Sequence, residues 1–170
     1  PISAEINELI NLTHLEISNN GDNFGGNIPN LNNLVNLKTL NLSHSNLTNS
    51  NDESLFNFLD FNNLQELQYL DLSDNNIIGK LNLFKDGNYV INSLKKITFL
   101  DLSNNNISGE LPFLDLPNLI TLNLSHNNII GDIINILSVP ISKITPKTTT
   151  QNITTLPLPD GKQLPPTVPP

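Results

Sequence analysis

The 170-residue chain contains no cysteine, methionine or tryptophan, and its eight basic residues other than histidine are all lysines. Without cysteine there can be no disulfide, no thiolate nucleophile and no cysteine-based zinc site. Sixteen acidic residues and the lack of arginine argue against nucleic-acid binding, which needs dense positive charge and bidentate arginine contacts. No apolar run approaches the roughly 20 residues that span a bilayer, so we expect no membrane insertion.

Asparagine, in contrast, occurs 31 times, and many of its copies lie in a phrase that recurs along the chain. The five copies are LTHLEISNN from Leu12, LKTLNLSHS from Leu37, LQYLDLSDN from Leu67, ITFLDLSNN from Ile97 and LITLNLSHN from Leu119. Their central leucines are 25, 30, 30 and 22 residues apart, at Leu15, Leu40, Leu70, Leu100 and Leu122. Such spacing indicates a solenoid with one structural unit, or rung, per copy.

Within each phrase the L-x-L alternation predicts a short strand whose leucines point inward, and the stacked strands predict a parallel sheet. Three residues after the last inward position comes a side chain that can bond backbone groups in the turn leaving the strand. This asparagine ladder comprises Asn20, Asn75, Asn105 and Asn127. Ser45 takes the place of asparagine in the second rung, where we expect a local irregularity.

The segments after the ladder, such as Ile107-Ser108-Gly109-Glu110-Leu111-Pro112, resemble the plant-type extracellular leucine-rich repeat of receptor-kinase ectodomains and polygalacturonase-inhibiting proteins. The resemblance covers about residues 2–137. It implies an α/β solenoid with a short parallel β-sheet on its concave face and few or no regular helices, over residues 1–139. The cysteine-containing caps usual in the family are missing, and the sequence begins in mid-repeat.

Residues 140–170 have a different composition, with eight prolines and seven threonines. Such a segment favours polyproline II or disorder, and we predict an extended tail with a degenerate terminal strand at 141–145. The tail offers candidates for O-glycans or hydroxyproline. These are Thr148, Thr149, Thr150, Thr154, Thr155, Thr167, Pro165, Pro166, Pro169 and Pro170.

Six N-x-S/T sequons predict N-glycosylation if the protein is extracellular, as the family resemblance implies. Their asparagines are Asn11, Asn41, Asn46, Asn106, Asn123 and Asn152. In Asn41 and Asn123 the repeat itself supplies the serine, so chance explains these two equally well. Asn46, Asn106 and Asn152 are expected in turns or in the tail and are the better candidates.

Several side chains are expected on the concave face, the solvent-exposed side of the stacked strands. The candidates for binding are Glu16, Tyr69, Asp71, Asp74, Phe99 and Asp101. Stacked acids could hold calcium, but solvated carboxylates tolerate the strand spacing, so we predict no metal site. No Ser/His/Asp grouping, compact histidine site or phosphate-binding loop is evident, and we therefore predict neither enzymatic activity nor a cofactor.

Two functions remain open. The first is an extracellular, glycosylated structural or adhesive protein that assembles head to tail through its uncapped end and its tail. The second is a recognition module that binds a protein, peptide or glycan on the concave face. The concave face shows neither an aromatic cluster nor a contiguous apolar patch in the sequence, so we favour the structural function.

Overall fold

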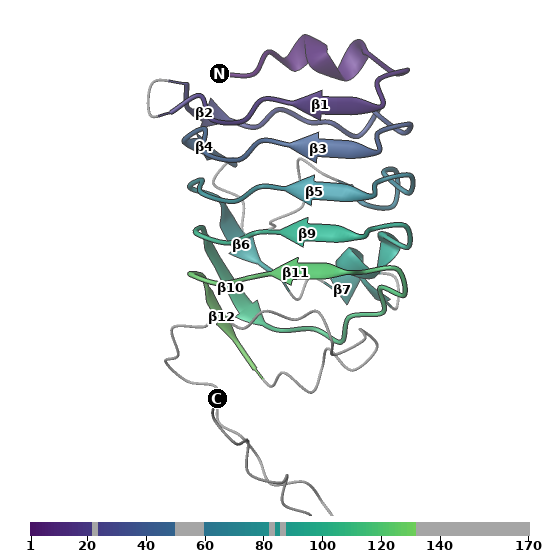
Figure 1. Cartoon of the computed structure of the whole chain (residues 1–170), viewed down its shortest axis with the longest axis vertical. Coiled ribbons are helices and arrows are strands. Elements are labelled where there is room, and N and C mark those ends of the chain that lie inside the picture. Colours follow the sequence, from purple (N-terminus) through teal and green to yellow (C-terminus); the bar gives the residue numbers. More distant parts are fainter. Residues whose placement is uncertain (22–23, 50–59, 82–83, 86–87, 132–170) are drawn as a thin grey trace, which may run out of the picture.

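The computed structural model describes residues 1–21, 24–49, 60–81, 84–85 and 88–131. Its main element is a five-stranded parallel sheet, in which each strand comes from one copy of the repeated phrase (Figure 1). In order across the sheet, the strands are β1 (His14–Glu16), β3 (Thr39–Asn41), β5 (Tyr69–Asp71), β9 (Phe99–Asp101) and β11 (Thr121–Asn123). The predicted leucine-rich-repeat solenoid with a short parallel sheet is therefore confirmed.

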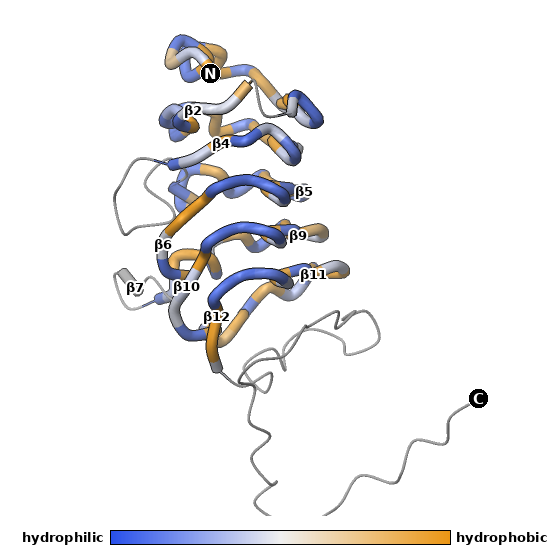
Figure 2. Tube along the Cα trace, turned by 90° about the vertical axis from the view of Figure 1, so that its left-hand side faces the viewer, coloured by the Kyte–Doolittle hydropathy of each residue, from blue (hydrophilic) through white to orange (hydrophobic). Residues whose placement is uncertain are grey.

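A second set of strands, which the repeat pattern did not predict, crosses the side of the stack (Figure 2). Three of them form a parallel sheet: β6 (Ile78–Lys80), β10 (Asn106–Glu110) and β12 (Asn128–Ile130). In the first two rungs, β2 (Gly26–Asn27) pairs in parallel with β4 (Leu47–Thr48). These strands follow the ladder position, so each rung bonds to its neighbour a second time after leaving the main sheet.

The remaining elements are short. An antiparallel pair, β7 (Phe84–Lys85) and β8 (Asn88–Tyr89), precedes the 3₁₀ helix η2 (Val90–Ser93). The 3₁₀ helix η1 (Ala4–Glu8) lies before β1 at the N-terminal end of the stack (Figure 1). The described residues contain no α-helix, in agreement with the prediction of few or no regular helices. The predicted tail and the strand predicted at 141–145 lie outside the described residues.

The core is a column of leucines and isoleucines repeated from rung to rung. The central strand leucines Leu40, Leu70 and Leu100 are fully buried, and Leu15 and Leu122 in the outer strands remain 7% and 6% exposed. Phe61 is the largest fully buried side chain. Since one rung has no interior of its own, the apolar side chains are shielded only when neighbouring rungs stack.

The asparagine at the ladder position connects each rung to the preceding one. Asn75 Nδ2 donates to the carbonyl oxygens of Leu42, Leu72 and Ser73 at 2.8, 3.1 and 3.0 Å, and its Oδ1 accepts from the backbone N–H of Leu47 at 2.8 Å. Asn105 and Asn127 repeat this pattern one rung further on each time. Asn20, in the first rung, is exposed, and its side-chain amide donates to the Ser18 carbonyl of its own rung at 3.2 Å.

The second rung is irregular at the position of the missing asparagine. The Ser45 hydroxyl donates toward the Ile17 and Ser43 carbonyls, both at 3.0 Å, and accepts from the Asn20 N–H only at 3.5 Å. The residue before the ladder position has positive φ in every rung, and in the first two rungs the residue after it, Gly21 or Asn46, also has it, at 64° and 49°. The turn of the second rung thus resembles that of the first and differs from those of the last three.

Two buried asparagines outside the repeated phrase serve the same purpose. Asn49 donates to the Ile78 carbonyl at 2.8 Å and accepts from the Ile78 N–H at 2.9 Å, so its amide connects the end of β4 to β6. Asn92 donates to the Phe113 carbonyl at 2.9 Å and accepts from the Asp115 N–H at 3.0 Å. In both cases a carboxamide forms the bonds that a peptide group of a longer strand would make.

Replacing Asn75 by alanine should lower the free energy of unfolding by about 3 kcal/mol, because buried N–H and C=O groups in two rungs would lose their partner. Asn76 is the matched control. It is exposed and makes one side-chain bond, to Asn46 Oδ1 at 2.5 Å, so its replacement by alanine should cost less than about 1 kcal/mol. Urea unfolding measures both, and equal effects would contradict a special role of the ladder position.

Candidate functional site

The concave face consists of two rows of side chains that run across the five strands. Strand register aligns the first row as His14, Thr39, Tyr69, Phe99 and Thr121. It aligns the second as Glu16, Asn41, Asp71, Asp101 and Asn123. At a strand spacing of about 4.8 Å each row is about 20 Å long. Five of the six binding candidates lie in these rows, and the sixth, Asp74, lies in the turn after β5.

In the last four strands, the second row is held in place by the serine two residues further on. Asp71 Oδ1 accepts from the Ser73 N–H at 3.0 Å and from its hydroxyl at 2.6 Å. Asp101 makes the same bonds with Ser103. Asn41 and Asn123 also bond to the serine that follows them. One oxygen of each side chain is thus fixed against the backbone, and in the two aspartates Oδ2 stays directed away from it.

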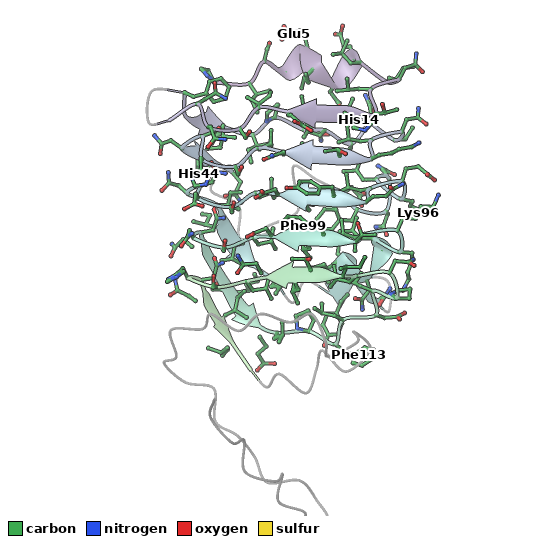
Figure 3. The ribbon with its side chains drawn as sticks, in the orientation of Figure 1. Glu5, His14, His44, Lys96, Phe99 and Phe113 are labelled. Carbon is green, nitrogen blue, oxygen red and sulfur yellow. The ribbon has the colours of Figure 1, made fainter. Side chains whose placement is uncertain are left out.

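Tyr69 and Phe99 stack in the centre of the first row, with ring centroids 4.4 Å apart and an angle of 4° between the ring planes. The expectation that this face has no aromatic cluster is therefore wrong. On adjacent strands the side chains project in the same direction at nearly the same spacing as stacked rings. The outer faces of the pair are flanked by the small side chains of Thr39 and Thr121, and Figure 3 shows Phe99 on β9 in the middle of the sheet.

The centre of the face is acidic. None of the five strands contains a lysine. Asp101 Oδ2 accepts from Asn123 Nδ2 at 2.9 Å, and Asp71 Oδ2 lies 3.5 Å from the Tyr69 hydroxyl. Lys95 pairs with Asp115 and Lys96 with Glu66. Both lysines precede β9, and Figure 3 shows Lys96 at the edge of the sheet where the chain enters the strands, here called the strand-entry edge. The carboxylates of the second row thus have no basic partner in the described part of the chain.

The pKa of the Tyr69 hydroxyl responds to this environment. Partial burial raises it above the usual value of 10.0, and the negative charge of Asp71 raises it further, with smaller effects of Asp101 and Glu16. The phenol therefore stays protonated in neutral solution and can donate a hydrogen bond.

The histidines are dispersed. His44 Nε2 lies 3.2 Å from Asp74 Oδ2 across one rung, while His14 and His126 lie in the first and last rungs. No group of three or more histidine or acidic side chains within the described residues is arranged to hold a metal ion. Nor does any helix among them have the length and apolar character needed to cross a membrane.

Family profiles match most of the repeated region. The profile described as Leucine Rich Repeat matches residues 36–58 and 66–85, and Leucine Rich repeats (2 copies) matches residues 95–139. The chain belongs to the leucine-rich-repeat family. At the level of sequence alone, no curated protein matches this leucine-rich-repeat chain.

Solved structures similar to this leucine-rich-repeat chain include two receptor-kinase ectodomains, the first from Arabidopsis thaliana and the second from Arabidopsis. One is GASSHO1/SCHENGEN3 in complex with CASPARIAN STRIP INTEGRITY FACTOR 2, with 30% identity over 85% of this chain and a TM-score of 0.67. The other is HAESA with an IDA peptide hormone ligand, with 29% identity over 76% of this chain and a TM-score of 0.61. These matches confirm the inferred resemblance to plant-type extracellular repeats.

A plant ice-binding protein is also similar, with 27% identity over 78% of this chain and a TM-score of 0.56. The chain spans 16% of the GASSHO1/SCHENGEN3 ectodomain, 20% of HAESA and 39% of the ice-binding protein. It thus corresponds to a short portion of each relative, and one fold serves unrelated ligands in them.

The sequon asparagines occupy different surroundings. Asn11 and Asn106 are exposed, and Asn106 is the first residue of β10 and not part of a turn. Asn46 is half-buried and precedes β4. Asn41 and Asn123 end strands of the main sheet, and Asn123 Nδ2 donates to Asp101 Oδ2 and to Ser103 Oγ. Asn152 and all candidates for O-glycans or hydroxyproline lie outside the described residues.

The raised pKa of Tyr69 predicts an alkaline loss of stability. The folded state holds the phenolic proton to higher pH than the unfolded chain does, so this contribution is constant below about pH 10 and declines as pH rises through the raised pKa. Tyr69→Phe should remove that part of the decline. The difference in tyrosinate absorbance between wild type and Tyr69→Phe should titrate above pH 10.0, and a midpoint at or below it would refute the prediction.

Proposed function

We propose that this chain is a non-catalytic, extracellular recognition module that binds an extended peptide segment across its concave face. The stacked rings of Tyr69 and Phe99 in the centre of that face carry the proposal. Aromatic side chains on an otherwise polar surface are typical anchors of protein interfaces, since they bury a large area with little loss of conformational freedom. The flanking threonines leave the outer faces of the rings accessible to a ligand.

The relatives support this function by analogy. The structures of GASSHO1/SCHENGEN3 and HAESA are complexes, the latter with a peptide hormone. A strand row of about 20 Å can accommodate about six residues of an extended peptide. The neighbouring rungs of a longer solenoid would extend the same rows.

Head-to-tail assembly, which the sequence favoured, becomes the second candidate. One observation supports it: Leu9 and Ile10 at the N-terminal end of the stack are 51% and 55% exposed. The tail that was expected to cover such an end lies outside the described residues. Tyr69 and Phe99 now give recognition the stronger support.

We further propose that N-glycans are attached at Asn11 and Asn106, and that Asn41 and Asn123 stay unmodified. A glycan on Asn123 would replace an N–H of an amide that already makes two hydrogen bonds. The bond of the Asn106 side chain, by contrast, is made by its oxygen, which accepts from Asn128 Nδ2 at 2.8 Å. An amide glycosylated at its nitrogen can retain that bond. Glycans at the two exposed positions leave the concave face open.

Peptide recognition is tested with a phage-displayed library of random peptides of about 12 residues, long enough to cross the face when extended. The full chain should enrich a set of binders that Thr39→Trp abolishes, because the indole would cover the face next to Tyr69. Gln65→Trp, at an exposed turn position, is the matched control and should enrich the same set. Concave-face recognition would be refuted if the wild-type chain enriched no peptides, or if Thr39→Trp enriched the same peptides equally strongly. Sedimentation velocity of the same samples reports any self-assembly.

Glycosylation is tested by expression in a eukaryotic secretory host followed by enzymatic deglycosylation in heavy-oxygen water, which labels every formerly occupied asparagine. Peptide mapping should find the label at Asn11 and Asn106 and none at Asn123. High occupancy at Asn123 would contradict the proposal that the second row is free of sugar.

A further inference from the structure

The second row places negative charge directly beside the aromatic stack. Asp71 follows Tyr69 by two residues on β5, and Asp101 follows Phe99 by two residues on β9, so side chains of one strand project toward the same face. The two carboxylates lie on adjacent strands in register, about 4.8 Å apart along the sheet. Each has its Oδ1 fixed by a serine, while its Oδ2 faces a neutral side-chain donor, the Tyr69 hydroxyl for Asp71 and Asn123 Nδ2 for Asp101.

The charges of this region are not balanced from within. No lysine lies in the five strands, and the ion pairs of Lys95 and Lys96 are on the strand-entry edge. Glu16 adds a third carboxylate two strands from Asp71, in the same row. Lys38, which directly precedes β3, forms no ion pair with Asp71 or Asp101 in the described structure. Among the residues that the structure describes, a cationic partner would therefore displace no lysine from these carboxylates.

Aromatic rings beside carboxylates match the two parts of a basic side chain. The methylene stem of lysine or arginine packs on an aromatic ring, and its cationic head is attracted to the ring face and to a nearby carboxylate. The acidic field is already evident at the Tyr69 hydroxyl, where Asp71, Asp101 and Glu16 all raise the pKa. A ligand carboxylate or phosphate would instead be repelled.

We propose that the Tyr69–Phe99 stack and the carboxylates of Asp71 and Asp101 form a subsite for a lysine or arginine side chain of the bound peptide. This inference rests on the proposed recognition function and specifies its partner as a basic peptide segment. The alkyl stem lies along the rings, and the head bridges the Oδ2 atoms of the two aspartates, of which the one in Asp101 also accepts from Asn123 Nδ2 at 2.9 Å. The complementary charge selects this occupant over an acidic or purely apolar segment.

The repeats themselves supply the variants that test the subsite. Asn41 and Asn123 occupy the same row as Asp71 and Asp101 and make the same bonds to the following serine. Asp71→Asn with Asp101→Asn should therefore remove both charges and leave the turns intact. Glu8→Gln with Glu110→Gln is the matched control, since both residues are exposed, lie outside the two rows, and change the net charge equally.

The random peptide library is selected with wild type, with the double asparagine variant and with the double glutamine control. Wild type and control should enrich lysine and arginine by about threefold or more over the starting library, and the asparagine variant should lose that enrichment. For one selected peptide, replacing its arginine by citrulline should weaken binding to wild type by about tenfold and to the asparagine variant by less than about twofold. Phe99→Leu should weaken the arginine peptide by about two- to fivefold.

The outcomes separate this inference from the proposed function. Binders that Thr39→Trp abolishes but that show no basic enrichment would overturn the subsite and leave peptide recognition standing. Basic enrichment that survives Asp71→Asn with Asp101→Asn would overturn the subsite. Enrichment that falls equally in the glutamine control would assign the effect to net charge and would also overturn the subsite. Thermal unfolding of each variant verifies that a loss of binding does not reflect loss of the fold.

Discussion

The carboxamide that spans two rungs is the interaction on which this solenoid depends. It carries a donor and an acceptor in the arrangement of a peptide group, so one side chain can satisfy backbone groups that the turns would otherwise leave unpaired in the interior. Asn75 does so for three carbonyls and for the Leu47 N–H, and Asn49 and Asn92 do so at other levels of the stack. Leucine burial drives the stacking, while these amides fix the distance and register of one rung on the next.

The strands that lie within the repeated phrase were predictable from the sequence, because a strict local period specifies them. The L-x-L phrase identifies the five strands and the rows of the concave face, since alternation determines which side chains point outward. The side strands β6, β10 and β12 were missed because their sequences lack the alternation of apolar and polar residues that predicts a strand. They pair through backbone groups around glycines such as Gly79 and Gly109. Asn49 and Asn92 were missed because they stand outside the phrase, where one asparagine in 31 carries no positional signal.

The candidate site was predictable in position but not in arrangement. The period placed Tyr69 and Phe99 in one row, yet their stacking depends on side-chain torsions and on the small size of Thr39 and Thr121 at either side. The polarity of the site depends on which oxygens of Asp71 and Asp101 are hydrogen-bonded by the turns that follow the strands. Ser73 and Ser103 donate to one oxygen of Asp71 and Asp101, respectively. The L-D-L-S motif alone does not predict these bonds, because they depend on the geometry of the turn.

Ser45 has a consequence for how force passes through the molecule. In a one-dimensional stack every junction carries the same load. At the ladder position, the junction between the first two rungs has a serine bond of 3.0 Å to the Ile17 carbonyl and a 3.5 Å contact to the Asn20 N–H, where the others have asparagine bonds to a backbone N–H of 2.8–3.0 Å. Under tension along the solenoid axis, we expect this junction to open first. The first rung would peel away while the four behind it, which contain the aromatic pair and both aspartates, keep their shape. Loss of the first rung would thus remove only His14 and Glu16 from the two rows of the concave face.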